Sequence, residues 1–312
     1  MKKSIWFLLT LLMLTVCAAA VFIGPAHHPG SDILLKIRLP RVLAGLIAGA
    51  GLASAGAVFQ GLLRNPLADP YILGASSGAG AGVILALLLG AGRTSPVFYL
   101  LVCSGALGAT FLSYSLARID RKVPIVNLLL SGVIVSTFLG ALIVLFISLM
   151  RSESISAFFF LIGSITENDF LTLAVSSMLV AAGLSTALAF SRQLDILSLG
   201  EEKAGHLGVD AETLKTVLFC ASALMVGAAV ALSGTIGFVG LIVPHAVRLI
   251  AGPGHRRLIP ASALGGGIFL VAMDAVARTA AAPMEIPVGV LTALTGAPFF
   301  IWLLRKKKKE IL

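Results

Sequence analysis

Ten long apolar stretches alternate along the chain with short polar segments or segments containing glycine and proline. An α-helix of about 20 apolar residues crosses the hydrocarbon core of a bilayer. The pattern therefore predicts ten membrane-spanning helices, at residues 4–23, 42–62, 72–91, 96–117, 124–149, 170–190, 213–232, 236–250, 258–280 and 286–304. The eighth is short and contains Pro244, which predicts a broken or tilted helix. Residues 155–165 are too few to cross and predict a helix at the membrane surface.

The composition excludes a water-soluble enzyme. Of the 312 residues, 58% are apolar and 12% are charged, whereas a soluble domain carries about a quarter charged residues. The expected fold class is all-α, a polytopic membrane protein in which residues 1–312 form one transmembrane domain. No catalytic residue, cofactor or metal site is predicted. Cys17, Cys103 and Cys220 each lie in an apolar run without a neighbouring ligand, so we interpret them as small packing residues.

The first apolar stretch has two interpretations. Lys2 and Lys3 followed by an apolar run and the small residues Ala18 to Ala20 are also typical of a secretory signal peptide. Nine further apolar segments favour an uncleaved first helix.

The distribution of Lys and Arg predicts the orientation. With ten crossings and a cytoplasmic N-terminus, 17 of the 23 basic residues fall on the cytoplasmic side. Cytoplasmic segments of membrane proteins carry such an excess, so both termini are expected in the cytoplasm. The net charge of +9 then reflects topology rather than nucleic-acid binding. The six exceptions are Lys36, Arg38, Arg41, Arg93, Arg151 and Arg278.

Small residues recur at four-residue intervals, as at Gly45 and Gly49 and at Gly74, Gly78 and Gly82. Such spacing lets lipid-embedded helices approach closely, and we interpret most of these glycines as packing positions. The run from Gly74 to Gly82 lacks the Gly-Lys-Ser/Thr ending of a P-loop. If ATP drives this protein, another polypeptide must therefore hydrolyse it.

Asp274 is the acidic residue expected in the middle of a span, and Arg278 follows four residues later on the same helix face. A structural ion pair is the preferred interpretation. The alternative is a proton relay, which would make the chain an ion-coupled secondary transporter.

Arg38 and Arg41, with Lys36 before them, lie at the outer end of the second span, and Arg278 lies at the outer end of the ninth. Anionic lipid headgroups or an acidic protein partner outside the membrane could each explain these charges, because the arginine fork matches carboxylates. The residues alone do not decide between the two.

Two connections interrupt the apolar pattern. Residues 65–70 contain two prolines and two turn formers and predict a tight cytoplasmic turn, with a rigid corner beside a transport path as the alternative. Residues 192–212 form the largest inner loop. Its Glu-Glu-Lys-Ala core predicts a short helix between glycines, which is either an inert loop or a helix that docks on a cytoplasmic motor.

At these residues the chain resembles the FecCD family, the permeases of ABC importers for iron-siderophore complexes, haem and vitamin B12. Four blocks carry the resemblance, which covers about residues 36–305. They are residues 38–41, residues 56–78, the loop at 199–208, and residues 234–245 continuing into 274–278, 285–289 and 296–298.

The resemblance implies a ten-helix fold of the type II importer class in the cytoplasmic membrane. It also implies a second permease subunit, which we expect to be an identical copy, two ATPase subunits and an extracytoplasmic binding protein. Arg38, Arg41 and Arg278 would then meet glutamates of the binding protein. The loop that couples the permease to the ATPase would comprise Leu199, Gly200, Glu201, Glu202, Ala204, Gly205, Leu207 and Gly208.

In this family the substrate passes along the twofold axis beside the fifth and tenth helices. Candidate lining residues are therefore Asn127, Ser131, Ser136, Thr292 and Thr295. Residues 124–130 are mostly apolar, and the sequence leaves ferric siderophore, haem and cobalamin open as substrates.

Overall fold

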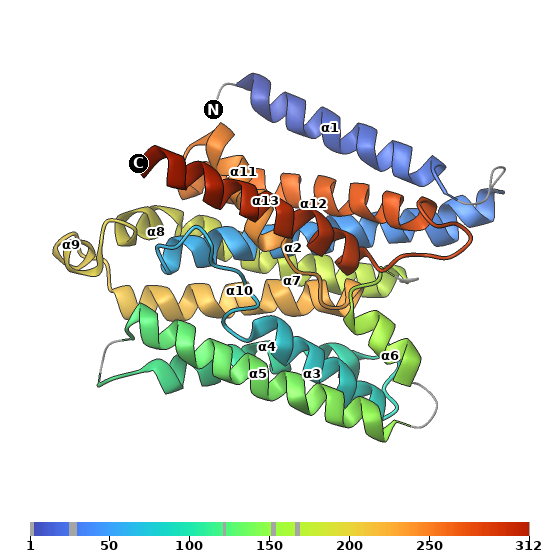
Figure 1. Ribbon diagram of the computed structural model, residues 1–312, viewed down its shortest axis with the longest axis horizontal. Coiled ribbons are helices and arrows are strands. Elements are labelled where there is room, and N and C mark those ends of the chain that lie inside the picture. Colours follow the sequence, from blue (N-terminus) through green and yellow to red (C-terminus); the bar gives the residue numbers. More distant parts are fainter. Residues whose placement is uncertain (1–2, 25–29, 121–122, 151–153, 166–168, 312) are drawn as a thin grey trace.

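The computed structural model describes residues 3–24, 30–120, 123–150, 154–165 and 169–311, and the regular elements of these residues are helices. Figure 1 shows a bundle whose long helices run roughly parallel or antiparallel to one axis. In chain order the elements are α1 (Lys3–Phe22), η1 (Ile33–Arg38), α2 (Leu39–Leu62), α3 (Ala75–Leu88), α4 (Pro96–Ala117), α5 (Ile125–Leu149), α6 (Ser154–Leu161), α7 (Phe170–Ala189), α8 (Ser191–Leu197), α9 (Glu201–His206), α10 (Ala211–Ser233), α11 (Val239–Ala251), α12 (His255–Thr279) and α13 (Val288–Ile311).

Each of the ten predicted crossings contains a helix. Seven helical segments of the described chain are long and apolar enough to cross a membrane, and α3, α11 and the start of α13 are shorter apolar helices. The predicted all-α fold is therefore confirmed. The expected helix at residues 155–165 is α6, which buries Ala157 and Phe160 and exposes Ile155, Phe158 and Phe159.

The second crossing begins earlier than predicted. A π-helical turn, η1, precedes α2, and the two run on as one helical segment over Ile33–Leu62. The turn carries the bond from Leu39 N to Leu34 O. Pro40 has no N–H and its ring crowds the preceding turn, and a wider turn relieves that clash.

Helices α2 and α10 form the centre of the bundle. Within the most apolar 18 residues of each helix, 78% of the residues are buried in α2 and in α10, but only 6% are buried in α1. α2 packs most extensively on α12 and α10. Figure 1 accordingly shows α1 along one edge of the bundle.

Glycine allows the closest of these contacts. A Cβ at Gly49 would lie 2.2 Å from the carbonyl oxygen of Gly266 on α12, and one at Gly56 would lie 1.9 Å from that of Gly240 on α11. Gly78 and Gly105 bring α3 and α4 together in the same way. The predicted packing role of the small residues is thus confirmed at these positions.

The predicted packing role of the cysteines is confirmed only in part. Cys103 lies against Gly227 of α10, where a Cβ would be 3.3 Å from its sulfur. Cys220 is exposed on the surface of the chain. Cys220 lies on the face of α10 that points away from the bundle, so it does not pack against other helices of the same chain.

The interpretation of residues 65–70 as a tight cytoplasmic turn fits only the first part of the segment, since Asn65, Pro66 and Leu67 are half-buried or exposed and Ala68 N donates to Asn65 O at 3.1 Å. The segment between α2 and α3 folds back into the bundle, where Ala68 is 0% exposed and Asp69 is 7% exposed. Tyr71 N donates to Asp69 Oδ1 at 2.9 Å, and Ser136 Oγ donates to Tyr71 O at 3.0 Å. Side chains thus supply hydrogen bonds to backbone N–H and C=O groups of this irregular segment, which lipid could not do.

A second irregular segment lies between α10 and α11, whereas α11 itself runs through Pro244 without the predicted break. α10 ends at Gly234 and α11 begins after Phe238, and both residues have a positive φ. Thr235 Oγ1 donates to the carbonyl of Leu161 at the end of α6. The described part of the bundle core therefore contains two helix interruptions, and they lie near each other, since a Cβ at Gly237 would be 3.9 Å from the Tyr71 ring.

The two ends of the bundle carry different elements, and we name them by these. The α9 end holds α8, α9, the start of α1 and the end of α13; the α6 end holds η1, α6 and the C-terminal turn of α12 (Figure 1).

Replacing Gly49 by alanine is expected to destabilise the protein, because α2 and α12 must move apart. Overpacking of this kind costs roughly 1–3 kcal/mol. The matched control is Gly108→Ala on α4, where nothing lies within 4 Å of the added Cβ. Thermal unfolding in detergent should show a lower midpoint for Gly49→Ala and an unchanged or higher one for the control. Equal midpoints would refute the packing role of Gly49.

Candidate functional site

A buried lysine connects three elements at the α9 end. Lys215 on α10 is 2% exposed. Its Nζ lies 3.0 Å from Glu201 Oε1 on α9 and 2.8 Å from Glu212 Oε1, and it donates to Val123 O at 3.3 Å. A buried ammonium is tolerated only when its charge and its donors are matched in this way. Lys215 therefore fixes α9 and the segment that leads into α5 to the first turn of α10.

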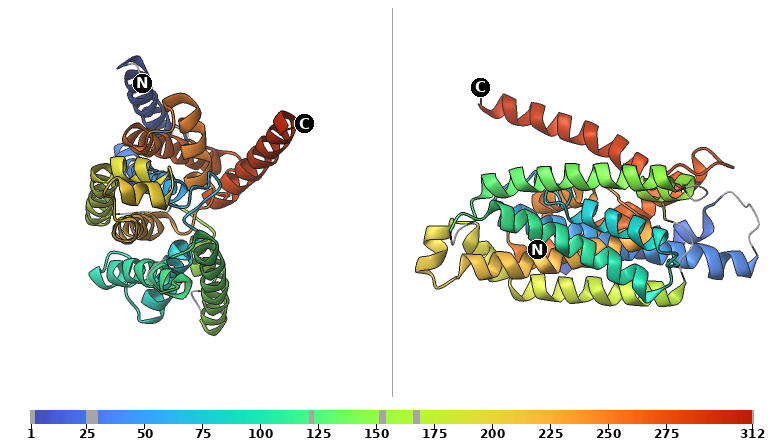
Figure 2. Two further views of the ribbon diagram at one scale, coloured as in Figure 1. Left: turned by 90° about the vertical axis from the view of Figure 1, so that its left-hand side faces the viewer. Right: turned by 90° about the horizontal axis from the view of Figure 1, so that it is seen from below.

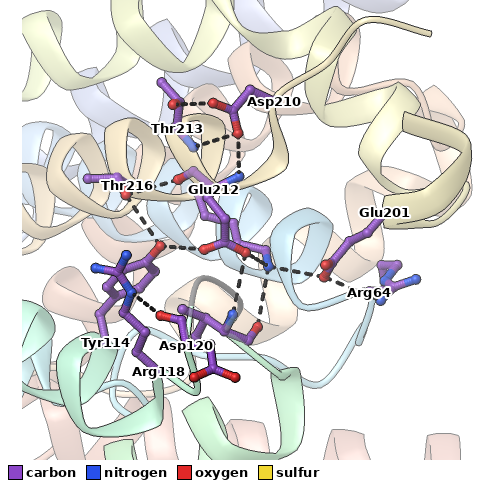
Figure 3. Close-up of polar contacts among 11 residues, drawn as sticks. Arg64, Tyr114, Arg118, Asp120, Glu201, Asp210, Glu212, Thr213 and Thr216 are labelled. Atoms are coloured by element: carbon purple, nitrogen blue, oxygen red, sulfur yellow. Dashed lines mark hydrogen bonds and ion pairs between the residues drawn. The ribbon is translucent and has the colours of Figure 1, made fainter. Parts of the chain in front are cut away.

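Glu212 extends the same cluster to α4. Its Oε2 accepts a 2.6 Å hydrogen bond from Tyr114 Oη, and its Oε1 accepts one from Val123 N at 3.4 Å. Figure 3 shows Glu212, Tyr114 and Thr216 close together, with Glu201 and Arg64 on the other side of the cluster. We call Lys215, Glu201, Glu212, Tyr114 and Val123 the Lys215 cluster.

Local sequence positions this cluster. Asp210 is the N-cap of α10, and its Oδ1 accepts from Glu212 N at 3.1 Å and from Thr213 N at 3.3 Å. Hydrogen bonds from Thr213 lower the pKa of Asp210, so the cap stays ionised at neutral pH. The cap starts α10 where Glu212 and Lys215 come to lie one turn apart and face the same neighbours.

The predicted short helix is present as α9. Gly200 precedes it with φ 120° and Gly208 follows it with φ 77°, two conformations that favour glycine. The Ala204 side chain is buried and anchors the helix to the bundle. A hydrogen bond from Val209 N to the Ala204 carbonyl closes the turn that follows. Glu201 is half-buried, whereas the other residues of the predicted coupling loop are exposed or, at Gly200, half-buried: Leu199, Gly200, Glu202, Gly205, Leu207 and Gly208.

A second pair lies beside α9. Asp195 on α8 accepts from His255 N at 2.9 Å and lies 2.6 Å from His255 Nδ1. Burial would raise the pKa of Asp195, but the hydrogen bonds from His255 outweigh it and hold the pKa below its usual value. The pair fixes α8 to the start of α12.

At the α6 end, two of the predicted docking arginines are buried within the chain. Arg38 is 4% exposed and donates to Val21 O at 3.2 Å and to Phe22 O at 2.8 Å. Arg278 is 3% exposed and donates to Ala20 O at 3.1 Å. The last carbonyls of a helix have no partner within it, so both arginines hold the C-terminus of α1.

The third arginine joins an ion-pair network. Arg41 Nε lies 3.0 Å from Asp274 Oδ1, and Arg41 Nη1 lies 2.9 Å from Glu285 Oε2. Arg278 Nε lies 3.0 Å from Asp274 Oδ2, which confirms the predicted pair on α12. Sequence reasoning missed the contact from Arg41, which joins residues 233 positions apart. Docking by Arg38, Arg41 and Arg278 stays a prediction, and a partner's carboxylates would compete with these internal acceptors.

The predicted lining residues on α5 differ in exposure. Ser131 is 6% exposed and donates to Ser113 O at 2.6 Å, whereas Ser136 contacts the irregular segment after α2. Asn127 is half-buried. Two of the three hydroxyl or amide groups are thus engaged by backbone.

On α13, Thr292 is 0% exposed and donates to Gly289 O at 3.0 Å, whereas Thr295 is exposed. Figure 2 shows α5 and α13 on the same side of the bundle, one at each edge of that face. Asn127 and Thr295 are therefore the candidates whose side chains are neither buried nor bonded to another segment of the described residues, since Thr295 Oγ1 donates within its own helix, to Leu291 O at 2.9 Å. Lining by any of the five residues stays a prediction.

In the described residues, seven long and three shorter apolar helices, polar clusters at both ends and a face bounded by α5 and α13 define the class, a polytopic permease rather than an enzyme. Residues 4–306 match the FecCD transport family, and the chain belongs to that family. The permease is a multi-pass membrane protein and is not itself an ATPase; its class works with ATPase and binding-protein partners.

Individual relatives support this assignment. The chain is 43% identical to the cobalamin import system permease protein BtuC of Halobacterium salinarum, over 96% of this chain and 80% of that one. It is 39% identical to the hemin transport system permease protein HmuU of Yersinia pestis, over 89% and 84% of the two chains. A solved inward-facing structure of a metal-chelate type ABC transporter superposes with a TM-score of 0.88 at 33% identity, over 98% of this chain and 100% of that one.

Asp274→Asn should destabilise the permease strongly, since it leaves two buried arginines without their shared carboxylate. Breaking a buried pair costs roughly 3–5 kcal/mol. Glu285→Gln is the control, because the Glu285 side chain is 45% exposed and such a pair is worth about 1 kcal/mol or less. Thermal unfolding compares the two variants. An Asp274→Asn protein of wild-type stability would contradict the structural role and favour a proton relay.

Proposed function

We propose that this chain, paired with a second copy of itself, forms the passage of an ABC importer for a chelated metal. The relatives are named for cobalamin, hemin and metal-chelate transport, which share a metal ion enclosed by a large organic ligand. Ferric siderophores belong to the same chemical class. Residues 1–312 would act as one transmembrane unit in the cytoplasmic membrane.

The α9 end would face the cytoplasm, with both termini on that side. Exposed basic residues at this end support the orientation, because cytoplasmic segments are enriched in Lys and Arg. They include Arg192, Lys203, Arg256 and Arg257. The α6 end would then receive the loaded binding protein, and Asp32, Lys36 and Glu285 are its more exposed charges, with side chains 81%, 77% and 45% exposed.

The observation that carries the proposal is the connection from α9 to α5 through Lys215. An ATPase subunit that moves α9 would pull on Glu201, and Lys215 would transmit this force to Val123, two residues before α5. α5 bounds the face proposed as the passage (Figure 2). Packed elements of this kind move as rigid bodies, which would switch access from one side of the membrane to the other.

A passage also has to release what it binds. The residues proposed to line it are neutral, and Ser131, Ser136 and Thr292 already donate to backbone carbonyls. Weak binding of this sort suits transport, since a tight site would retain the substrate. The alternative of an ion-coupled carrier is less well supported, because two arginines neutralise Asp274.

Glu201→Gln is expected to uncouple ATP hydrolysis from uptake. The change removes one carboxylate from Lys215 but leaves Glu212 and the Val123 carbonyl, so the fold should persist. Coupling free energies of 1–3 kcal/mol correspond to about 5–150-fold, and we expect uptake per ATP hydrolysed to fall at least about fivefold. Uptake of radiolabelled cobalamin, haem and a ferric siderophore, together with phosphate release, is measured in proteoliposomes holding the permease, its ATPase and its binding protein.

The adjacent Glu202→Gln provides the matched control. Glu202 is exposed and makes no ion pair among the residues that the structure describes. It should keep the wild-type ratio of uptake to hydrolysis. If both variants, or neither, change that ratio, the role assigned to Glu201 is wrong; uptake without the ATPase would refute the ABC mechanism itself.

A further inference from the structure

A cavity opens at the α9 end beside the predicted coupling loop. Its volume is about 490 Å³, and it lies between the C-terminus of α2, helix α8, the end of α11 and the start of α12. The residues that give it chemical character are Gln60, Arg64, Asp195, Leu199, Arg248 and His255. None of them belongs to the face between α5 and α13, so the cavity is separate from the proposed passage.

The charge of the cavity is not balanced within the chain. Arg248, on the last turn of α11, is half-buried and makes no hydrogen bond or ion pair with any residue that the structure describes. Arg64 is 38% exposed, and its nearest carboxylate oxygen, on Glu201, lies 3.9 Å from Nη2, which is too far for a hydrogen bond. The carboxylate of Asp195 is already held by His255.

Two buried polar atoms on the wall of the cavity also have no partner. Gln60 is 3% exposed and His255 is 5% exposed, yet Gln60 Oε1 and His255 Nε2 make no hydrogen bond among the described residues. A Cβ at Gly61, which also lines the cavity, would lie 2.5 Å from His255 Nε2, so glycine lets α2 pack closely against the His255 ring. Both unpaired atoms lie behind the surface of the cavity, and the groups that an occupant can reach are the guanidinium groups of Arg64 and Arg248.

We propose that this cavity receives an acidic side chain of the cytoplasmic ATPase subunit, which Arg248 and Arg64 hold through charge-assisted hydrogen bonds. The inference rests on the proposed function. Leu199 belongs both to the cavity wall and to the predicted coupling loop and is 63% exposed, so one surface continues from α9 into the cavity. Planar guanidinium groups bind carboxylates in a bidentate manner. Two neighbouring arginines without a carboxylate at hydrogen-bond distance therefore favour an aspartate or glutamate as the occupant.

The cavity would fix the ATPase beside α9 and thereby direct its movement onto Glu201. Arg64 contributes to both, because it lines the cavity and lies nearest to Glu201. Its backbone has φ 49°, a left-handed conformation that ends α2 and directs the chain into the buried segment that follows.

The first test measures binding of the purified ATPase subunit to the permease in nanodiscs. Arg248→Gln should weaken binding at least about tenfold, the effect of losing about 1.4 kcal/mol. Arg192→Gln is the control, because Arg192 is exposed on α8 at the same end but does not line the cavity; it should change the affinity less than about twofold. Unfolding midpoints identify a variant that fails to fold, and Arg64→Gln then serves in its place.

A second test identifies the chemistry of the occupant. In Arg248→Lys, the new amine should form an amide with a carboxylate of the ATPase after carbodiimide activation, and mass spectrometry locates the linked residue. Arg192→Lys should form no such link.

Three outcomes would overturn the proposal. They are equal affinities for Arg248→Gln and Arg192→Gln, no link at position 248, and an effect of Arg248→Gln that occurs only in nanodiscs with anionic lipid, which would assign the cavity to a lipid headgroup. The Glu201→Gln measurement is independent. If Glu201→Gln uncouples transport while Arg248→Gln binds normally, the cavity proposal fails alone.

Discussion

Lipid surrounds this bundle and gives its helices no hydrophobic reason to associate, so close backbone contact has to hold them together. Glycines on α2 meet that constraint, since Gly49 and Gly56 bring its backbone against α12 and α11. The same constraint applies to every irregular segment in the core. Residues 63–74 and 234–238 are tolerated there because Ser136, Asp69 and Thr235 bond their backbone or that of their neighbours. These two interruptions leave α3 and α11 as short helices, with α3 packed on α4 and α11 packed on α2 and α12.

The ion pairs of the described residues lie at the two ends of the bundle. At the α6 end, Asp274 forms ion pairs with two arginines. Arg38 and Arg278 also hold α1 by donating hydrogen bonds to its last carbonyls. At the α9 end, Lys215 is shared by two carboxylates and a carbonyl that come from different elements. A compensated cluster buried at an end can transmit movement without exposing charge to lipid. The two ends can therefore serve two protein partners.

Much of the fold could be predicted from local sequence. Apolar stretches predicted ten crossings, the Glu-Glu-Lys-Ala core predicted α9, and the spacing of Asp274 and Arg278 predicted their pair. Contacts between distant residues could not be predicted in this way. Lys215 bonds Val123 across 92 positions, and nothing in either segment alone indicates the other. A lysine and a glutamate three residues apart at the start of an apolar helix were the one available signal. Residues 65–70 have the composition of a surface turn, and only tertiary packing buries Ala68, Asp69 and Pro70.

The central claim is that α9 and the start of α5 move as one body through Lys215. It is tested most directly by the distance between spin labels at Gly205 and Val126 of one permease copy, both exposed positions, in the assembled transporter without nucleotide and with ATP trapped. The account predicts that this distance changes by less than about 2 Å, as expected within a rigid body. A change of about 5 Å, a full helical turn, would show that α9 moves independently of α5 and would contradict the account.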